Sequence, residues 1–205
     1  MTRLQFLRSV AAVALIALVP MSLHAQEADG AAFVSTFAQK GINDILTAGI
    51  ANAEKQQRFR DMFKTYFDIP GIGRFVLARF AKAASPAELE KFNTLFEDVI
   101  VYTLSRRFSE YNGQTLKVTG QQPDGKGLLV KSTILGNASG SFGVDWRLRK
   151  RPEGFKVLDI VVEGVSMAIT YRQDYSTVIS QSGSFAGLLV QMEKQVADLK
   201  AQQGA

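Results

Sequence analysis

The feature that most constrains the fold is a change in the spacing of apolar residues at Gly113. Before Gly113, apolar side chains recur every three or four residues, as on one side of a helix. After it they alternate with polar or small residues, as on a strand, and beyond Gly164 the helical spacing returns. This order of helices, strands and helices, without strand–helix–strand alternation, predicts an α+β fold.

The first part of the chain, residues 27–113, contains two clear helix starts. Asp68 stands two residues before a proline and is a predicted N-cap. Ser85 and Glu88 have the spacing of a capping box, with a proline between them. The sequence therefore predicts several helices, the last of them running from Ser85 to a left-handed stop at Gly113.

The middle part, residues 114–163, holds four segments in which apolar residues have period two. The stretch from Lys150 to Gly154 has the composition of a hairpin loop between the last two segments. These segments predict a four-stranded antiparallel sheet with one covered face. The remaining residues, 164–200, predict two helices, the second of which is capped by Ser184.

The first 25 residues have the pattern of a secretory signal peptide. A basic start is followed by an apolar run from Val10 to Val19, which is too short to span a bilayer, and then by Pro20. We expect cleavage after Ala25, so that residues 26–205 form a single exported domain with its own core.

The composition excludes much familiar chemistry. The chain has no cysteine, and its one histidine, His24, lies in the predicted signal peptide. Because Cys and His are the usual nucleophile, general base and soft-metal ligand, Ser-His-Asp, Cys-His and zinc hydrolase mechanisms are excluded. Without Arg3 and Arg8 the charge is 22 basic against 19 acidic residues, which is too mild to indicate a nucleic-acid partner. We expect no catalytic residue, metal site or cofactor.

Four stretches of the sequence resemble the MlaC family, the periplasmic phospholipid-binding components of the Mla lipid-transport ABC system, also called toluene-tolerance substrate-binding proteins. They are FDIPGIGRFVL at 67–77, RFSEYNG at 107–113, VLDIVVEGVS at 157–166 and YRQDY at 171–175. The stretches follow the family's order along nearly the whole mature chain, which makes the resemblance specific.

The resemblance implies a sheet that is NTF2-like in shape, with surrounding helices that enclose an apolar cavity for acyl chains. It implies a soluble, monomeric periplasmic carrier whose cargo is phospholipid. Its partners would be an outer-membrane lipoprotein complex and an inner-membrane ABC transporter with a lipid-binding subunit. Fourteen phenylalanines fit such a cavity, although they fit a filled core equally well.

The predicted lipid-binding residues are large apolar positions of the expected core. Some lie in or beside the matching stretches and the others follow from periodicity. Arg147, Arg149 and Arg151 form a basic cluster and are the predicted residues for headgroup contact or partner docking. The predicted lipid-binding residues are Phe75, Phe96, Val99, Phe108, Val144, Trp146, Leu148, Val161, Val165, Met167, Ile169, Tyr175 and Ile179.

Three other interpretations stay open. The stretch VEGVSM at 162–167 is similar to a sister group associated with hopanoid production, so the cargo would be a hopanoid-type lipid. NTF2-like domains also include enzymes, in which Asp159 or Tyr171 would act as acid or base. Such an enzyme would direct a carboxylate into its cavity. The third interpretation is a purely structural adaptor, which would have no cavity.

Overall fold

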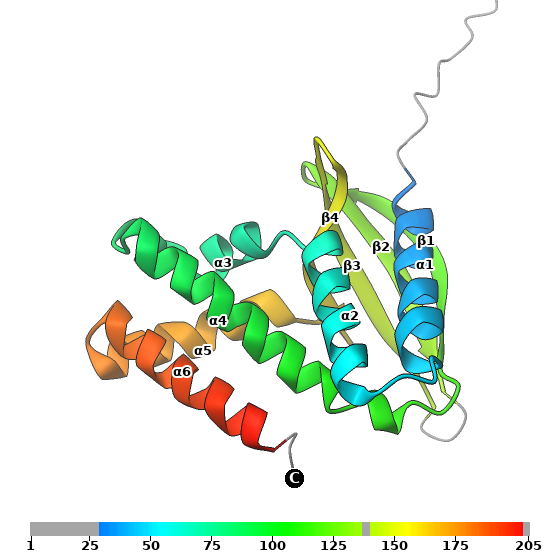
Figure 1. Ribbon diagram of the computed structural model, residues 1–205. Helices are drawn as coiled ribbons and strands as arrows, with labels where there is room; N and C mark the ends of the chain where they lie inside the picture. The colour runs from blue at the N-terminus through cyan, green and yellow to red at the C-terminus, as the bar shows by residue number, and fades with distance from the viewer. Residues whose placement is uncertain (1–28, 137–139, 203–205) are drawn as a thin grey trace, which may run out of the picture.

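The computed structural model describes residues 29–136 and 140–202 of the 205-residue chain (Figure 1). The predicted signal peptide lies outside the described residues. Helices precede the sheet and two more follow it, as the spacing predicts. Before the sheet the chain forms α1 (Gly30–Gly41), the π-helical turn η1 (Ile42–Leu46), α2 (Asn52–Tyr66), α3 (Ile69–Leu77), the 3₁₀ turn η2 (Ala78–Lys82), α4 (Pro86–Ser105) and the 3₁₀ turn η3 (Phe108–Glu110).

The predicted helix starts are confirmed by hydrogen bonds. The Asp68 side chain accepts a bond from the backbone N–H of Gly71 at 2.9 Å, at the start of α3. Ser85 and Glu88 form both bonds of a capping box at the start of α4. Each of these bonds satisfies a backbone donor that the first helical turn leaves without an intrahelical partner.

The prediction that the helix begun at Ser85 continues to Gly113 is wrong. α4 ends at Ser105, and the chain then turns through η3. The apolar spacing continues past the helix because Phe108 is still partly buried, with its ring 5.5 Å from the ring of Phe59 in an edge-on contact. Apolar spacing reflects which residues are buried, and here buried residues continue beyond the end of the helix.

The described residues form a five-stranded antiparallel sheet in which each strand pairs with the next along the chain. The α+β class, the antiparallel sheet and the hairpin between the third and fourth strands are confirmed. The strands are β1 (Thr115–Asp124), β2 (Gly127–Leu135), β3 (Ser141–Arg151), β4 (Gly154–Val162) and β5 (Val165–Ser166).

The fifth strand was not predicted. Glu163 and Gly164, with φ of 49° and 81°, form a two-residue turn that returns Val165 to pair with Val162. A strand of two residues is too short to show alternation, and glutamate is unusual at a left-handed turn position. The first of the two helices expected within residues 164–200 begins after this strand, at Met167, as α5 (Met167–Ser182).

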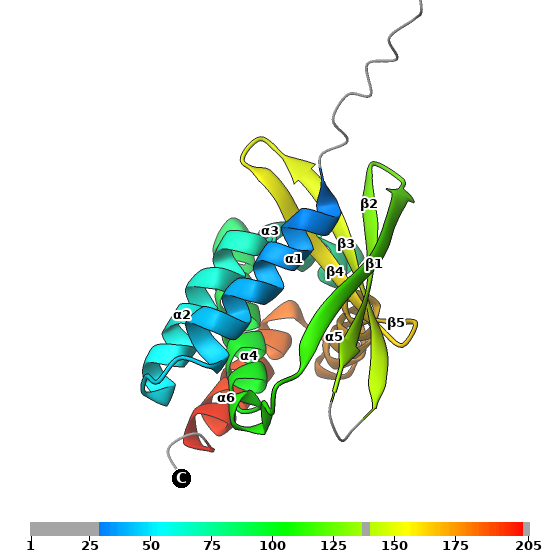
Figure 2. The same ribbon diagram turned by 90° about the vertical axis from the view of Figure 1, so that its right-hand side faces the viewer.

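One face of the sheet, here called the inner face, is covered by α1 and α2 (Figure 2). Along β3 the buried residues Val144, Trp146 and Leu148 lie on this face. The indole N–H of Trp146 donates a hydrogen bond of 3.0 Å to the hydroxyl of Ser132, so its one polar atom is paired. The inner face is therefore apolar and its polar group is satisfied.

The helices α3 to α6 form a helical region beside β4, at the edge of the sheet opposite β1 (Figure 1). The last of them, α6 (Phe185–Ala201), begins at Ser184, whose hydroxyl accepts a bond from Gly187 N–H as predicted. The region has its own group of packed rings, contributed by α4, α5 and α6. These rings are Phe92, Phe96, Tyr171, Tyr175 and Phe185.

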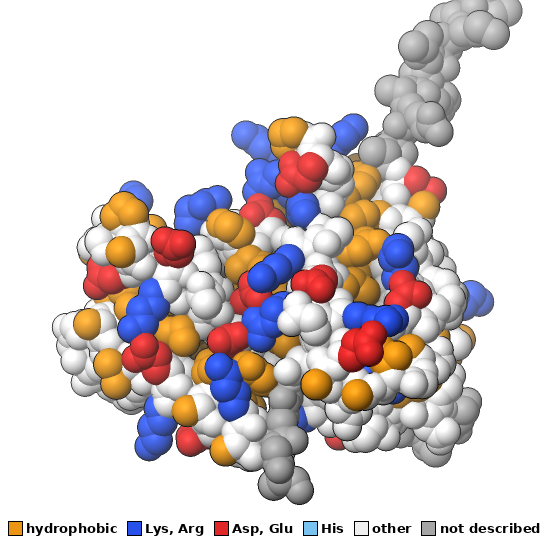
Figure 3. All heavy atoms as spheres, in the orientation of Figure 1, with side chains coloured by type: hydrophobic (Ala, Val, Ile, Leu, Met, Phe, Trp, Pro, Cys, Tyr) orange, Lys and Arg blue, Asp and Glu red, His pale blue; other side chains and the backbone are white. Residues whose placement is uncertain are grey.

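Ion pairs join the two parts. On the face that Figure 3 shows, acidic and basic side chains alternate over α2 and α4. Arg60 of α2 contacts Glu97 at 2.6 Å and Asp98 at 2.7 Å, both on α4.

Across the described ranges, no helix combines the length and hydropathy that a membrane-spanning helix requires.

Replacing Phe92 with alanine tests the packing of the rings of the helical region. Phe92 is fully buried, so Phe92→Ala is expected to lower the free energy of unfolding by about 3–5 kcal/mol, measured by urea denaturation. The control is Phe75→Ala, at a side chain that is 44% exposed, with an expected loss below about 1 kcal/mol. If both variants lost the same free energy of unfolding, the buried packing of Phe92 would be contradicted.

Candidate functional site

An apolar cavity of about 540 Å³ lies between the inner face of the sheet and the helices that cover it. Its walls come from the end of α1, η1, α2, the segment after α4, and strands β1 to β3. Its volume is within the range of about 300–1,000 Å³ that is usual for small-molecule sites. The lining residues are Phe37, Ala38, Gly41, Ile42, Ile45, Leu46, Phe59, Met62, Arg107, Phe108, Glu110, Tyr111, Gln114, Thr115, Leu116, Ile134, Gly136, Gly140, Phe142 and Trp146.

The tilt and composition of α1 explain why a cavity exists here. At its first residue α1 touches the sheet, because a Cβ added to Gly30 would lie 2.9 Å from a methyl carbon of Leu128. At the other end, Phe37 contacts Trp146 with ring centroids 5.4 Å apart. The small residues Ala38 and Gly41 follow and line the cavity, and a Cβ added to Gly41 would lie 3.5 Å from the Met62 side chain of α2. Space remains where the helix presents small side chains.

The cavity is apolar inside and charged at its edge. Arg107 and Glu110 line it with side chains that are 72% and 67% exposed, so they mark its opening to solvent. Phe108, next to Arg107, is partly buried and lines the same cavity. An apolar interior beneath a charged edge can hold an amphiphile, with its tail inside and its polar group outside.

Of the predicted lipid-binding residues, Phe108 and Trp146 line this cavity. Val144 and Leu148 are buried on the same face of β3, on either side of Trp146. They pack in the core and do not line the cavity.

The other predicted residues lie elsewhere. Four are buried in the core of the helical region, three are exposed, and two are half-buried, and none of them lines the cavity. Their contact with lipid stays a prediction. The buried residues are Phe96, Val99, Tyr175 and Ile179, the exposed ones Phe75, Val165 and Ile169, and the half-buried ones Val161 and Met167.

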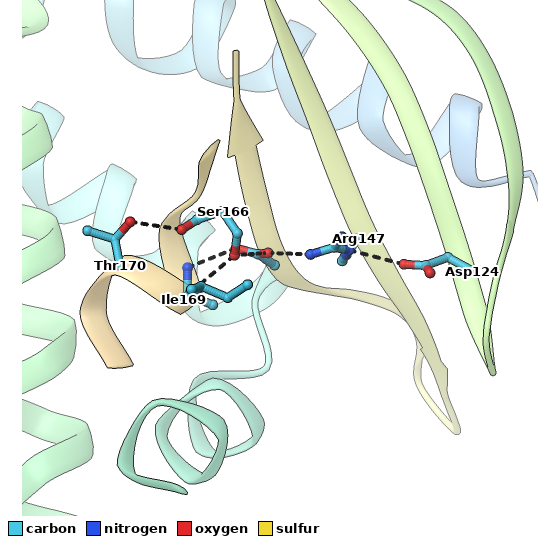
Figure 4. Close-up of polar contacts among 7 residues, drawn as sticks. Asp124, Arg147, Ser166, Ile169 and Thr170 are labelled. Atoms are coloured by element: carbon cyan, nitrogen blue, oxygen red, sulfur yellow. Dashed lines mark hydrogen bonds and ion pairs between the residues drawn. The ribbon is translucent and has the colours of Figure 1, made fainter. Parts of the chain in front are cut away.

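The three predicted arginines also lie away from the cavity. Arg147 is on the outer face of the sheet, where its guanidinium contacts Asp124 at 3.1 Å and Asp159 at 3.0 Å (Figure 4). Arg151 forms an ion pair with Asp68, the N-cap of α3. Arg149 and Arg147 line a smaller hollow of about 210 Å³. Their contact with a headgroup or a partner stays a prediction.

Asp159, the first candidate for acid–base chemistry, joins β4 to the start of α5. Its buried carboxylate accepts bonds from the Ser166 hydroxyl at 2.6 Å and from Ala168 N–H at 2.9 Å. Ser166 in turn accepts a bond from Ile169 N–H, and Figure 4 shows these contacts between Arg147 and the first turn of α5. Asp159 does not line the cavity, and its bonds fix the helix to the sheet.

Tyr171, the second candidate, lies among the rings of the helical region, 5.4 Å from Phe96. Burial raises its pKa above the ordinary value, and the nearby Asp174 adds to the shift. Burial raises the pKa of Tyr175 as well, and the neighbouring Tyr171 and Asp174 add to the shift. The buried Tyr175 hydroxyl has no hydrogen-bond partner in the described part of the chain. A phenol that is harder to ionise is a poor base at neutral pH.

The sequence analysis missed the cavity walls contributed by α1, η1 and α2. Phe37, Ile42, Ile45 and Phe59 have helical spacing, which is equally typical of a filled core. Ala38 and Gly41 at the end of α1 also border the cavity, but an analysis of apolar spacing takes no account of small residues.

Within residues 29–136 and 140–202, no group of three or more acidic, histidine or cysteine side chains is placed to hold a metal ion.

The chain is similar to known proteins in both sequence and fold. The sequence model of the MlaC protein family matches residues 29–194. The toluene tolerance protein ttg2D of Pseudomonas putida is 22% identical over 119 residues, which are 57% of this chain and 55% of that protein. The chain thus spans about half the length of this curated relative. A phospholipid-binding protein from Ralstonia solanacearum, solved in complex with a phospholipid, has the same fold, with a TM-score of 0.76 and 23% identity over 84% of this chain and 99% of that one.

Replacing Tyr175 with phenylalanine is expected to raise stability, most of all at alkaline pH. The variant loses an unpaired buried hydroxyl, which favours folding by about 1 kcal/mol at neutral pH. A tyrosine whose pKa is raised by folding stabilises the protein fully below about pH 10, and this contribution falls as the pH rises further. Urea denaturation at neutral and alkaline pH measures both effects. An alkaline decline as steep in Tyr175→Phe as in the native protein would refute this account.

Proposed function

The chain belongs to the MlaC family, and from this premise we propose that it is a soluble periplasmic carrier that binds phospholipid through its acyl chains. The observation that supports this most is the apolar cavity with a charged edge. Exposing an acyl chain to water costs about 0.8 kcal/mol per CH₂, and burial in the cavity removes that cost during transit. The phospholipid bound by the Ralstonia solanacearum protein of the same fold supports the same ligand class.

The proposed carrier moves phospholipid between an outer-membrane lipoprotein complex and an inner-membrane ABC transporter with a lipid-binding subunit. Export through a cleaved signal peptide would bring it to the periplasm as a monomer. Release of a buried chain requires the cavity to open, so each partner would bind the open conformation more tightly than the closed one. A ligand or partner can shift such an equilibrium only by its differential affinity for the two states.

The proposed lipid contacts begin with Phe108 and Trp146, because both line the cavity. Phe96 and Tyr175 belong to the packed rings of the helical region. They would contact lipid only in a conformation in which the helices of that region have moved apart. In the proposed site, Phe108 and Trp146 contact lipid in the present conformation. Phe96 and Tyr175 would join them only in an open conformation.

We propose binding without catalysis. Asp159 and Tyr171, which an acid–base mechanism would use, lie outside the cavity, and the carboxylate that lines it, Glu110, is mostly exposed at the edge. General acid–base catalysis needs the titrating group within hydrogen-bond reach of the bound substrate. We therefore propose that the cavity binds its ligand without reacting with it and uses no cofactor.

Native mass spectrometry of the protein purified from its own periplasm tests the proposal, with lipid identification after organic extraction. A stoichiometric phospholipid adduct is expected. A hopanoid adduct would instead assign the protein to the hopanoid-associated group. A lipid-free protein that also takes up no lipid from vesicles would refute the carrier function.

Filling the cavity is expected to prevent lipid binding. Ala38 lines the cavity, so Ala38→Trp places an indole in the space proposed for the acyl chain. Lipid uptake from vesicles should fall by at least about tenfold, equivalent to ~1.4 kcal/mol. The matched control is Ala32→Trp, at an exposed position of the same helix outside the cavity, and it should bind lipid normally. Equal uptake by both variants would place the lipid elsewhere.

A further inference from the structure

We propose that Arg107 binds the phosphate of the lipid and makes the cavity selective for phospholipids over neutral lipids with the same acyl chains. This inference rests on the proposed function and adds a specificity-determining residue to it. Among the described residues that line the cavity, Arg107 is the one with a positive charge. The lining also contains one carboxylate, Glu110, and neutral polar residues such as Gln114 and Thr115, and most of the rest is apolar, so Arg107 is the place in the described lining that attracts an anionic group.

The position of Arg107 puts a positive charge where the apolar interior ends. Arg107 and Phe108 are consecutive, yet the arginine is exposed while the phenylalanine is partly buried against Phe59. The boundary between interior and solvent therefore falls between two adjacent residues. In a phospholipid the phosphate is joined to the acyl chains through the ester-linked glycerol, so with the chains inside the cavity the phosphate lies at its edge, within reach of the long Arg107 side chain.

The volume of the cavity is compatible with this placement. A methylene group fills about as much space as a water molecule, about 30 Å³, so 540 Å³ corresponds to on the order of eighteen methylenes. The cavity therefore has room for acyl chain, and its charged residues lie at the opening, where the phosphate would be held beside Arg107.

Arg107 is available to a new anion because its present partner is weakly held. Its Nη1 lies 3.8 Å from a carboxylate oxygen of Glu110, and both side chains are mostly exposed. An exposed pair of this kind contributes at most about 1 kcal/mol. A phosphate can accept two parallel N–H bonds from the guanidinium, which is a stronger arrangement than one long contact.

Other arginines near the sheet are less suited to this role. Arg147 and Arg151 are already paired with carboxylates and lie outside the cavity. Arg106, the immediate neighbour of Arg107, is also exposed but lines a different depression, together with residues of α6 such as Lys194. Arg106 therefore carries the same charge at nearly the same place in the chain without reaching the cavity.

The test compares Arg107→Ala with Arg106→Ala in competition for two lipids. Each protein is equilibrated with an equimolar mixture of phosphatidylglycerol and diacylglycerol with identical acyl chains, and the adducts are counted by native mass spectrometry. The native protein and Arg106→Ala should prefer phosphatidylglycerol by about tenfold or more, and Arg107→Ala should lose that preference while still binding diacylglycerol. Both variants are at exposed positions, and circular dichroism verifies that they fold.

The outcomes separate this inference from the carrier function. If Arg107→Ala binds lipid and still prefers phosphatidylglycerol, Arg107 does not select phosphate and the inference is wrong. If Arg107→Ala loses both lipids to the same extent, the residue supports the cavity and does not recognise phosphate, which also overturns the inference. If the native protein binds neither lipid, the proposed function itself fails.

Discussion

The structure depends on how the inner face of the sheet is covered. β3 presents Val144, Trp146 and Leu148 to one side, and exposing such a surface to water would be costly. α1 covers this face closely where it begins at Gly30 and leaves it uncovered past Ala38. The uncovered part is the cavity. The same apolar face therefore supplies the core at one end and the candidate binding wall at the other.

The polar contacts hold the parts around this face without entering the cavity. Arg60 joins α2 to α4, Arg151 joins β3 to the start of α3, and Asp159 joins β4 to the start of α5. Because these contacts lie between the sheet side and the helical region, they resist relative movement of the two. An opening that releases a lipid would have to break some of them, and a partner would supply the compensating free energy.

The sequence predicted those parts of the fold that depend on local chemistry. The caps at Asp68, Ser85 and Ser184 were predictable because each satisfies backbone donors only a few residues away. The sheet was predictable because alternation along a strand reflects a covered face. The strand β5 was not, since a two-residue pairing has no period.

The cavity was beyond prediction for a different reason. Trp146 and Phe108 were among the predicted contacts, but spacing cannot distinguish an apolar side chain that fills a core from one that borders a space. That distinction depends on the small residues Ala38 and Gly41, which are seen to border the cavity only after α1 is placed on the sheet. A resemblance to lipid-binding proteins indicates a cavity without locating its walls.

The central claim is that the acyl chain lies against Trp146, and fluorescence tests it most directly. Trp146 is the one tryptophan in the chain and it lines the cavity, so all tryptophan emission comes from a residue of the cavity wall. The protein is loaded with phospholipid whose acyl chains carry bromine, a contact quencher, and is compared with protein loaded with the unbrominated lipid. The account predicts strong quenching by the brominated lipid. Stoichiometric binding of that lipid without quenching of Trp146 would contradict it.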